Sequence, residues 1–175
     1  MLPVTRRAGP RRRRRLIGES IVRRDRATGW AWQVTNLDLN LHALRLNAKL
    51  GSVADSVLAL PFRYGSFDVV IASQMTHHLI SVPDIIQHFR EAWRITKQAL
   101  VLSDLHRNAG FHALVRLVVH ALGLSPELRS DELLSVRHGI RFPKWEDLTR
   151  PAGISRARNW LHLSARIMLE ARKPV

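Results

Sequence analysis

Apolar and polar residues follow two different periods along this chain. Short runs of apolar, aromatic and β-branched residues, which predict strands, lie at residues 30–37, 67–72 and 99–103. Apolar residues at helical spacing, which predict helices, lie at residues 41–48, 85–95 and 111–122. Strand and helix therefore alternate, and this order predicts an α/β fold.

The predicted strands also indicate how the sheet is built. Residues 67–72 hold one charge among apolar residues, which is typical of a strand buried on both faces of a parallel sheet. A very short strand is expected at Val53. After a short helix at residues 145–152, residues 155–160 and 164–171 predict a closing antiparallel pair. We therefore expect a Rossmann-like, open and mostly parallel sheet with helices on both faces and a C-terminal antiparallel strand pair.

Polar residues follow three of the predicted strands directly. Asp38, Ser73 and Asp104 each stand at the carboxyl end of a run. Ligands of open α/β sheets bind beyond these ends of the strands. We therefore expect the three positions to line one crevice.

The net charge of +14 is concentrated at one end of the chain. Residues 1–30 hold ten arginines against Glu19 and Asp25, a net charge of +8. We expect residues 1–17 to form a basic, disordered arm, because like charges at this density repel one another. Residues 18–175 are expected to form one domain. The alternative is an arm that binds phosphate groups, which the lack of interleaved aromatic residues disfavours for nucleic acid.

The composition also excludes several kinds of site. The chain has no cysteine, and therefore no disulfide, thiolate nucleophile or Cys-type zinc site. His77, His78 and His88 do not have a recognised ligand spacing, so we expect no metal site. No apolar run is long enough to cross a bilayer, and no secretion signal is recognised at the start. A cytoplasmic protein is expected.

Several ordered segments carry a resemblance to one enzyme family. They are residues 37–40 (LDLN), 58–62 (LALPF), 65–70 (GSFDVV) and 77–79 (HHL). In this order they resemble class I S-adenosylmethionine-dependent methyltransferases, and most closely the ubiquinone/menaquinone-biosynthesis group and small-molecule methyltransferases of secondary metabolism. Residues 103–107 (SDLHR) and 134–137 (LSVR) are similar to one bacterial branch of that group. The resemblance implies methyl transfer from S-adenosylmethionine to a small aromatic, phenolic or quinone-like acceptor.

The resemblance assigns two contacts to the adenosine part of the cofactor. Asp38 matches the acidic residue that accepts hydrogen bonds from the ribose hydroxyls, and Leu39 would cover one face of the adenine. The alternative role for Asp38 is to cap the helix that follows it. The contact with the adenine amino group falls on Asp55, if a one-residue bulge is present, or on Ser56. A carboxylate suits an amino donor better than a hydroxyl.

The remaining matches lie toward the methionine part of the cofactor and the acceptor. Ser73 and Gln74 match the stretch along the methionine part. His77 and His78 resemble a histidine pair in which one member is a candidate general base, the alternative being a structural role beneath the cofactor. Residues that would line the acceptor side are Asp104, His106 and Arg107, whose alternative is loop structure. The apolar stripe at residues 111–122 would belong to the core or to the wall of the acceptor pocket.

One part of the family pattern is not recognised. Where a strand and a glycine-rich turn are expected, the chain has Arg11 to Arg15 and a single glycine, Gly18. That turn lets the backbone approach the amino-acid carboxylate of the cofactor. We therefore expect an N-terminally incomplete sheet and weak or absent cofactor binding, as in a truncated member with impaired activity. The alternative is a non-catalytic remnant or binding module whose Arg-rich arm contacts nucleic acid or acidic lipid.

Overall fold

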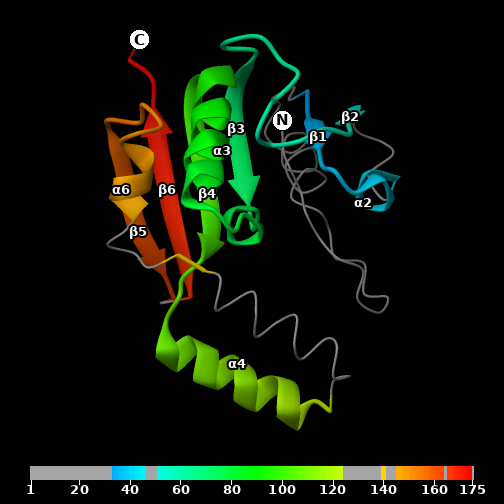
Figure 1. The fold of residues 1–175 in the computed structure, drawn as a ribbon, viewed down its shortest axis with the longest axis vertical. Coiled ribbons are helices and arrows are strands. Elements are labelled where there is room, and N and C mark those ends of the chain that lie inside the picture. Colours follow the sequence, from blue (N-terminus) through cyan, green and yellow to red (C-terminus); the bar gives the residue numbers. More distant parts are fainter. Residues whose placement is uncertain (1–32, 46–50, 124–138, 141–144, 164, 175) are drawn as a thin grey trace, which may run out of the picture.

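The computed structural model describes residues 33–45, 51–123, 139–140, 145–163 and 165–174, and its strands form two groups (Figure 1). The first group is the parallel pair β1 (Thr35–Leu37) and β2 (Gly51–Val53), joined through helix α2 (Leu41–Arg45). The second is a four-stranded sheet with the order β3-β4-β6-β5. The predicted arm, residues 1–17, lies outside the described residues.

A long helix connects the two parallel strands of the larger sheet. β3 (Phe67–Ser73) and β4 (Thr96–Leu105) pair in parallel, and α3 (Val82–Ile95) joins them after the short 3-10 helix η1 (Thr76–His78). Ser81 caps α3, because its hydroxyl accepts a hydrogen bond from the backbone N–H of Asp84, and a proline stands in the first turn. Both strands and the helix were predicted, although β4 is longer than expected.

Two antiparallel strands complete the larger sheet. β5 (Ala157–His162) and β6 (Arg166–Arg172) form a hairpin, as predicted, and β6 also pairs antiparallel with β4. The larger sheet is open and mixed: among its described strands the pairing of β3 with β4 is parallel, and the other two pairings are antiparallel. The predicted class of an open α/β sheet is confirmed. The sheet is less parallel than expected, because β6 lies between β4 and β5 and runs against both.

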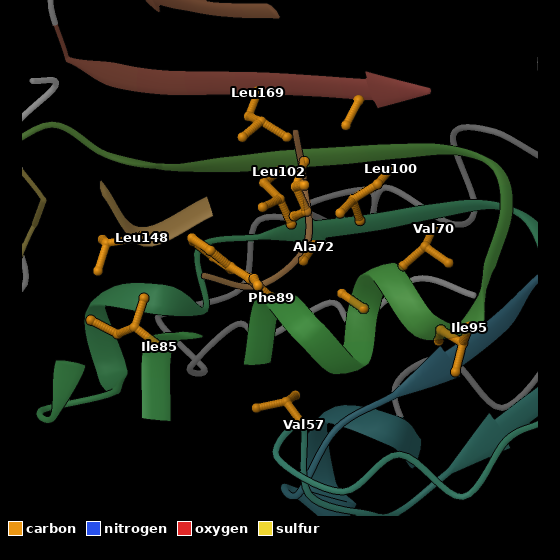
Figure 2. Packing of buried hydrophobic residues seen from close by; sticks show 14 of the residues in the cluster. Val57, Val70, Ala72, Ile85, Phe89, Ile95, Leu100, Leu102, Leu148 and Leu169 are labelled. Atoms are coloured by element: carbon orange, nitrogen blue, oxygen red, sulfur yellow. The ribbon is translucent and has the colours of Figure 1, made fainter. Parts of the chain in front are cut away.

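The core lies between the larger sheet and α3 (Figure 2). Phe89 on α3 points toward Ala72 of β3 and Leu102 of β4, and Phe89 is fully buried. Trp145, from the short helix α6 (Trp145–Thr149), packs edge-on against Phe89 with ring centroids 5.2 Å apart. Leu37 of β1 belongs to the same cluster. β1 is therefore positioned by the same core as β3 and β4.

A hydrogen-bonded network attaches the loop after β2 to α3. The backbone N–H of Leu60 donates to the Glu91 carboxylate at 2.8 Å, and the Arg94 guanidinium donates to the carbonyl oxygens of Leu60 and Phe62. Hydrogen bonding to Arg94 is the main cause that holds the pKa of Glu91 below its usual value. This network fixes the path of the chain between β2 and β3, where Asp55 and Ser56 lie.

Helix α4 (Ala109–Ala121) stands apart from these layers, beyond the carboxyl end of β4 (Figure 1). Asn108 caps it through hydrogen bonds from the backbone N–H groups of Gly110 and Phe111. Leu114, Leu117 and other apolar residues of this helix are largely exposed. Of the two roles expected for this stripe, the core is therefore excluded for these residues, and a wall of the acceptor pocket stays a prediction, because a helical period shows which residues share a side but not what covers it.

Candidate functional site

The buried carboxylate of Asp38 lies directly after β1. Its Oδ1 accepts a hydrogen bond from the backbone N–H of Asn40 at 2.9 Å, whereas Oδ2 is buried without a hydrogen-bond partner. The cap of α2 is Asn40, whose side chain accepts from the N–H groups of His42 and Ala43. Burial is the main cause that raises the pKa of Asp38. Asp38 therefore has one free acceptor atom at the carboxyl end of a strand.

Next to Asp38, Leu39 presents its side chain to solvent, with 67% of its surface exposed. An exposed apolar side chain beside a buried carboxylate provides a surface against which a flat ring can pack. The placement agrees with the predicted adenine contact, which stays a prediction.

Asp55 and Ser56 follow β2 and are both partly buried. Oδ1 of Asp55 accepts a hydrogen bond from the N–H of Ser56 at 2.7 Å, and Oγ of Ser56 accepts from the N–H of Leu58 at 3.2 Å. Both side chains thus shape the local turn. The two remain alternative candidates for the adenine contact.

The chain makes a sharp turn at the carboxyl end of β3. Ser73 is buried, and Gln74 after it has a φ of 56°. This left-handed conformation is uncommon for a residue other than glycine and costs about 1 kcal/mol or more. The N–H of Gln74 donates to the carbonyl oxygen of Ser103 at 2.8 Å, which ties the turn to β4. Strained positions of this kind cluster at functional sites.

Asp104, at the end of β4, holds that turn in place through hydrogen bonds. Its Oδ2 accepts hydrogen bonds from the backbone N–H groups of Met75 and Thr76, and its Oδ1 accepts one from Leu105. Oδ1 also lies 2.6 Å from Nδ1 of His77. Burial alone would raise the pKa of Asp104, but the hydrogen bonds and the charge of His77 lower it. The carboxylate therefore orders residues 75–77.

His77 and His78 differ in their surroundings although they are neighbours. His77 is buried and its Nδ1 is fixed by Asp104, whereas His78 is exposed. Their rings lie with centroids 4.1 Å apart. A carboxylate on one ring nitrogen fixes the orientation of the imidazole and leaves the other nitrogen available as an acceptor. Of the two candidates for a general base, His77 has this arrangement.

The structure places Asp104 differently from the acceptor-facing position that the sequence indicated. Both of its oxygens are engaged by the chain itself, and its exposed fraction is 2%. Its neighbours remain closer to solvent: His106 is partly buried and Arg107 is exposed. The N–H of His106 donates to the carbonyl of Ala165, and that of Arg107 donates to Ile140. His106 and Arg107 stay candidates for the acceptor side.

His88 on α3 is a polar residue that the sequence did not assign to the site. It is buried, and neither of its ring nitrogens has a hydrogen-bond partner of good geometry. Burial lowers the pKa of His88 to about 4, against the opposing effect of the nearby Asp104 charge. No local signal in the sequence separates it from neighbouring polar positions of the same helix, such as Gln87, which is partly buried, and Arg90, which is exposed.

The described residues were also compared with the requirements of a metal site and of a membrane-spanning helix. In the part of the chain that the structure describes, no group of three or more His, Cys, Asp or Glu side chains is arranged to hold a metal ion. None of the described helices is both long and apolar enough to cross a membrane.

Comparison with known proteins identifies the family. Residues 18–102 match the methyltransferase domain family. The chain carries a class I methyltransferase domain. The match includes β1 to β3 and α3 and most of β4, and with them Asp38, Asp55 and His77. The family predicted from the sequence is thereby confirmed, whereas the quinone-biosynthesis branch stays a prediction. No curated protein matches the sequence.

Solved structures share the fold of this methyltransferase domain. A SAM-dependent methyltransferase from Methanosarcina mazei is 14% identical over 89% of this chain and 87% of that one, with a TM-score of 0.60. A SAM-dependent methyltransferase from Aquifex aeolicus is 12% identical over 89% of this chain and 76% of that one, with a TM-score of 0.58. The trans-methyltransferase CalH, in complex with SAH, is 17% identical over 89% of this chain and 48% of that one, with a TM-score of 0.57. The chain spans only about half the length of several other solved structures that it matches: it covers 54%, 48% and 47% of three of them.

Proposed function

We propose that this methyltransferase domain transfers a methyl group from S-adenosylmethionine to a small-molecule acceptor of aromatic, phenolic or quinone-like character. The carrying observation is the buried Oδ2 of Asp38, which has no hydrogen-bond partner. A buried carboxylate oxygen without a partner is costly, and a ribose hydroxyl would offset that cost by donating a hydrogen bond. The family match and the SAH bound in CalH support the same cofactor for this chain.

The residues around the site fit an adenosine-containing cofactor. Asp38 would hold the ribose and Leu39 would pack on the adenine, with Asp55 or Ser56 at the adenine edge. The cofactor supplies an electrophilic methyl group on a sulfonium sulfur. The turn at Ser73 and Gln74, fixed to β4 by backbone hydrogen bonding, would lie along its methionine part.

On the acceptor side, the protein contributes position and a proton acceptor. Asp104 fixes Nδ1 of His77, which leaves Nε2 of that ring to accept a proton from a phenolic or enolic hydroxyl. Positioning alone accelerates a displacement greatly, so His77 is required only for acceptors that must lose a proton. His106 and Arg107 would contact the remainder of the acceptor.

The alternative of a non-catalytic module that acts through its Arg-rich arm is not favoured. The family match covers residues 18–102 and so begins just beyond the predicted arm. The arm lies outside the described residues. The proposed cytoplasmic location likewise remains a prediction.

The deciding experiment is a titration of the full chain with S-adenosylhomocysteine, followed by NMR so that weak affinity is measurable. Asp38→Asn removes the negative charge of the side chain and replaces one of its two acceptor oxygens by an NH2 donor. It should therefore weaken the binding of S-adenosylhomocysteine at least about tenfold. Asp147→Asn is the matched control, since Asp147 is an exposed aspartate in the first turn of α6. No binding by the wild type, or equal binding by both variants, would overturn the proposal.

A further inference from the structure

Helix α4 presents an apolar surface to solvent that the proposed methyl transfer does not explain. The exposed fractions of Leu114, Leu117 and Val118 are 55%, 67% and 44%, and that of Leu122 at the C-cap is 67%. Spacings of three and four residues place the first three on one side of the helix. Figure 1 shows α4 lying clear of the sheet and of α3. Large apolar side chains gathered on one exposed face are typical of an interaction surface.

The other side of α4 holds one positive charge, that of the exposed Arg116. His120 follows it at four-residue spacing and is also exposed, whereas His112, one turn earlier, is partly buried. No Asp or Glu occurs between Asp104 and Glu127. A helix with an exposed apolar side, an exposed arginine and no acidic residue is suited to lie in the plane of an anionic membrane surface.

Two more exposed apolar residues lie at the same edge of the molecule. Ile80, after the turn that follows β3, is 92% exposed, and Leu163, after β5, is 85% exposed. β3, β4 and β5 run in the same direction, since β4 and β5 are each antiparallel to β6. Ile80, Leu163 and α4 therefore all follow the carboxyl ends of strands.

We propose that α4 docks on an anionic lipid bilayer, with Leu114, Leu117 and Val118 inserted among the lipids and Arg116 near the phosphates. A second copy of the chain fits this surface less well, because each copy carries a net charge of +14 and the two helices would bring like charges together. Docking would place the carboxyl edge of the sheet against the membrane. The proposal concerns a surface and does not depend on cofactor binding.

The test is co-sedimentation of the full chain with vesicles of phosphatidylcholine alone and of phosphatidylcholine mixed with phosphatidylglycerol. Because the Arg-rich arm would also bind anionic vesicles, the comparison is made between Leu117→Glu and Tyr64→Glu. Tyr64 is 74% exposed and precedes β3, at the opposite edge of the sheet, and both variants change the charge equally. We expect Leu117→Glu to weaken binding to the mixed vesicles about tenfold, the effect of one leucine burial, and Tyr64→Glu to change it less than about twofold.

A labelled chain gives an independent measurement. The protein has no cysteine, so Leu117→Cys and Tyr64→Cys each provide a single site for an environment-sensitive dye. The emission should shift to the blue on the mixed vesicles only for the label at position 117. Equal binding of the two glutamate variants, or no shift at position 117, would overturn the proposal and assign the binding to the arm. A concentration-dependent dimer that Leu117→Glu abolishes without vesicles would overturn it in favour of a second copy.

Discussion

Nδ1 of His77 lies 2.6 Å from Oδ1 of Asp104, and both side chains are almost fully buried. The pair joins the turn after β3 to the end of β4, across 27 residues of sequence. The same carboxylate accepts two backbone N–H groups of that turn. The conformation of the turn at the candidate site therefore depends on the buried carboxylate of Asp104.

Replacing Asp104 by asparagine should destabilise the protein by about 3 kcal/mol at neutral pH. The amide loses the negative charge and turns a donor toward N–H groups that need an acceptor, and breaking a buried pair from one side carries a cost of that size. Urea unfolding measures the change. Asp68→Asn is the control, because Asp68 pairs with Lys97 at the surface and should contribute less than about 0.5 kcal/mol. Equal effects of both substitutions would contradict the importance of the buried pair.

The contribution of Asp104 should also depend on pH. Its pKa in the folded protein lies below the ordinary aspartate value of 3.8, so the folded state binds the proton less readily than the unfolded chain. The stabilisation is therefore fully present above about pH 4 and is lost as the pH falls through the folded-state pKa. The unfolding free energies of the wild type and Asp104→Asn should converge in acid. Curves that stay parallel down to the lowest pH at which the protein folds would contradict this.

His88 should make the protein sensitive to a milder pH range. Burial lowers its pKa from 6.5 to about 4, so the unfolded chain takes up a proton in this range before the folded protein does. Stability is full above pH 6.5 and should fall by about 3 kcal/mol as the pH decreases toward 4. His88→Leu should remove this dependence at little cost at pH 7, because neither ring nitrogen is paired. His42→Leu, at an exposed histidine, should leave it unchanged.

For a phenolic acceptor, His77→Gln should lower kcat by about a hundredfold or more if His77 accepts the proton. Asp104→Asn should also lower kcat, since it removes the carboxylate that orients the His77 ring. His78→Gln is the matched variant, because His78 is exposed next to His77. A kcat unchanged in His77→Gln, with only stability lowered, would assign His77 the structural role instead.

The sequence predicted the parts of the fold that follow from local pattern. Residues 67–72 lie within β3, and the predicted hairpin matches β5 and β6, because continuous or alternating apolar runs specify burial directly. For Asp104 the sequence left open an acceptor contact or a role in loop structure, and in the structure its carboxylate holds a turn 27 residues earlier. No local period encodes such a contact. The same limit applies to α4, whose spacing defined an apolar side without showing that it is exposed.

The last prediction separates the two halves of the cofactor. Asp38 and Leu39 offer contacts to adenosine, whereas Arg11 to Arg15 and Gly18 stand where the family pattern has a glycine-rich turn for the amino-acid carboxylate. Methylthioadenosine, which lacks the amino-acid part, should therefore bind with an affinity within about tenfold of that of S-adenosylhomocysteine, the factor that one charge-assisted contact contributes. NMR titration of both compounds checks this. Micromolar affinity for S-adenosylhomocysteine, with far weaker binding of methylthioadenosine, would show that other residues of the chain hold the carboxylate.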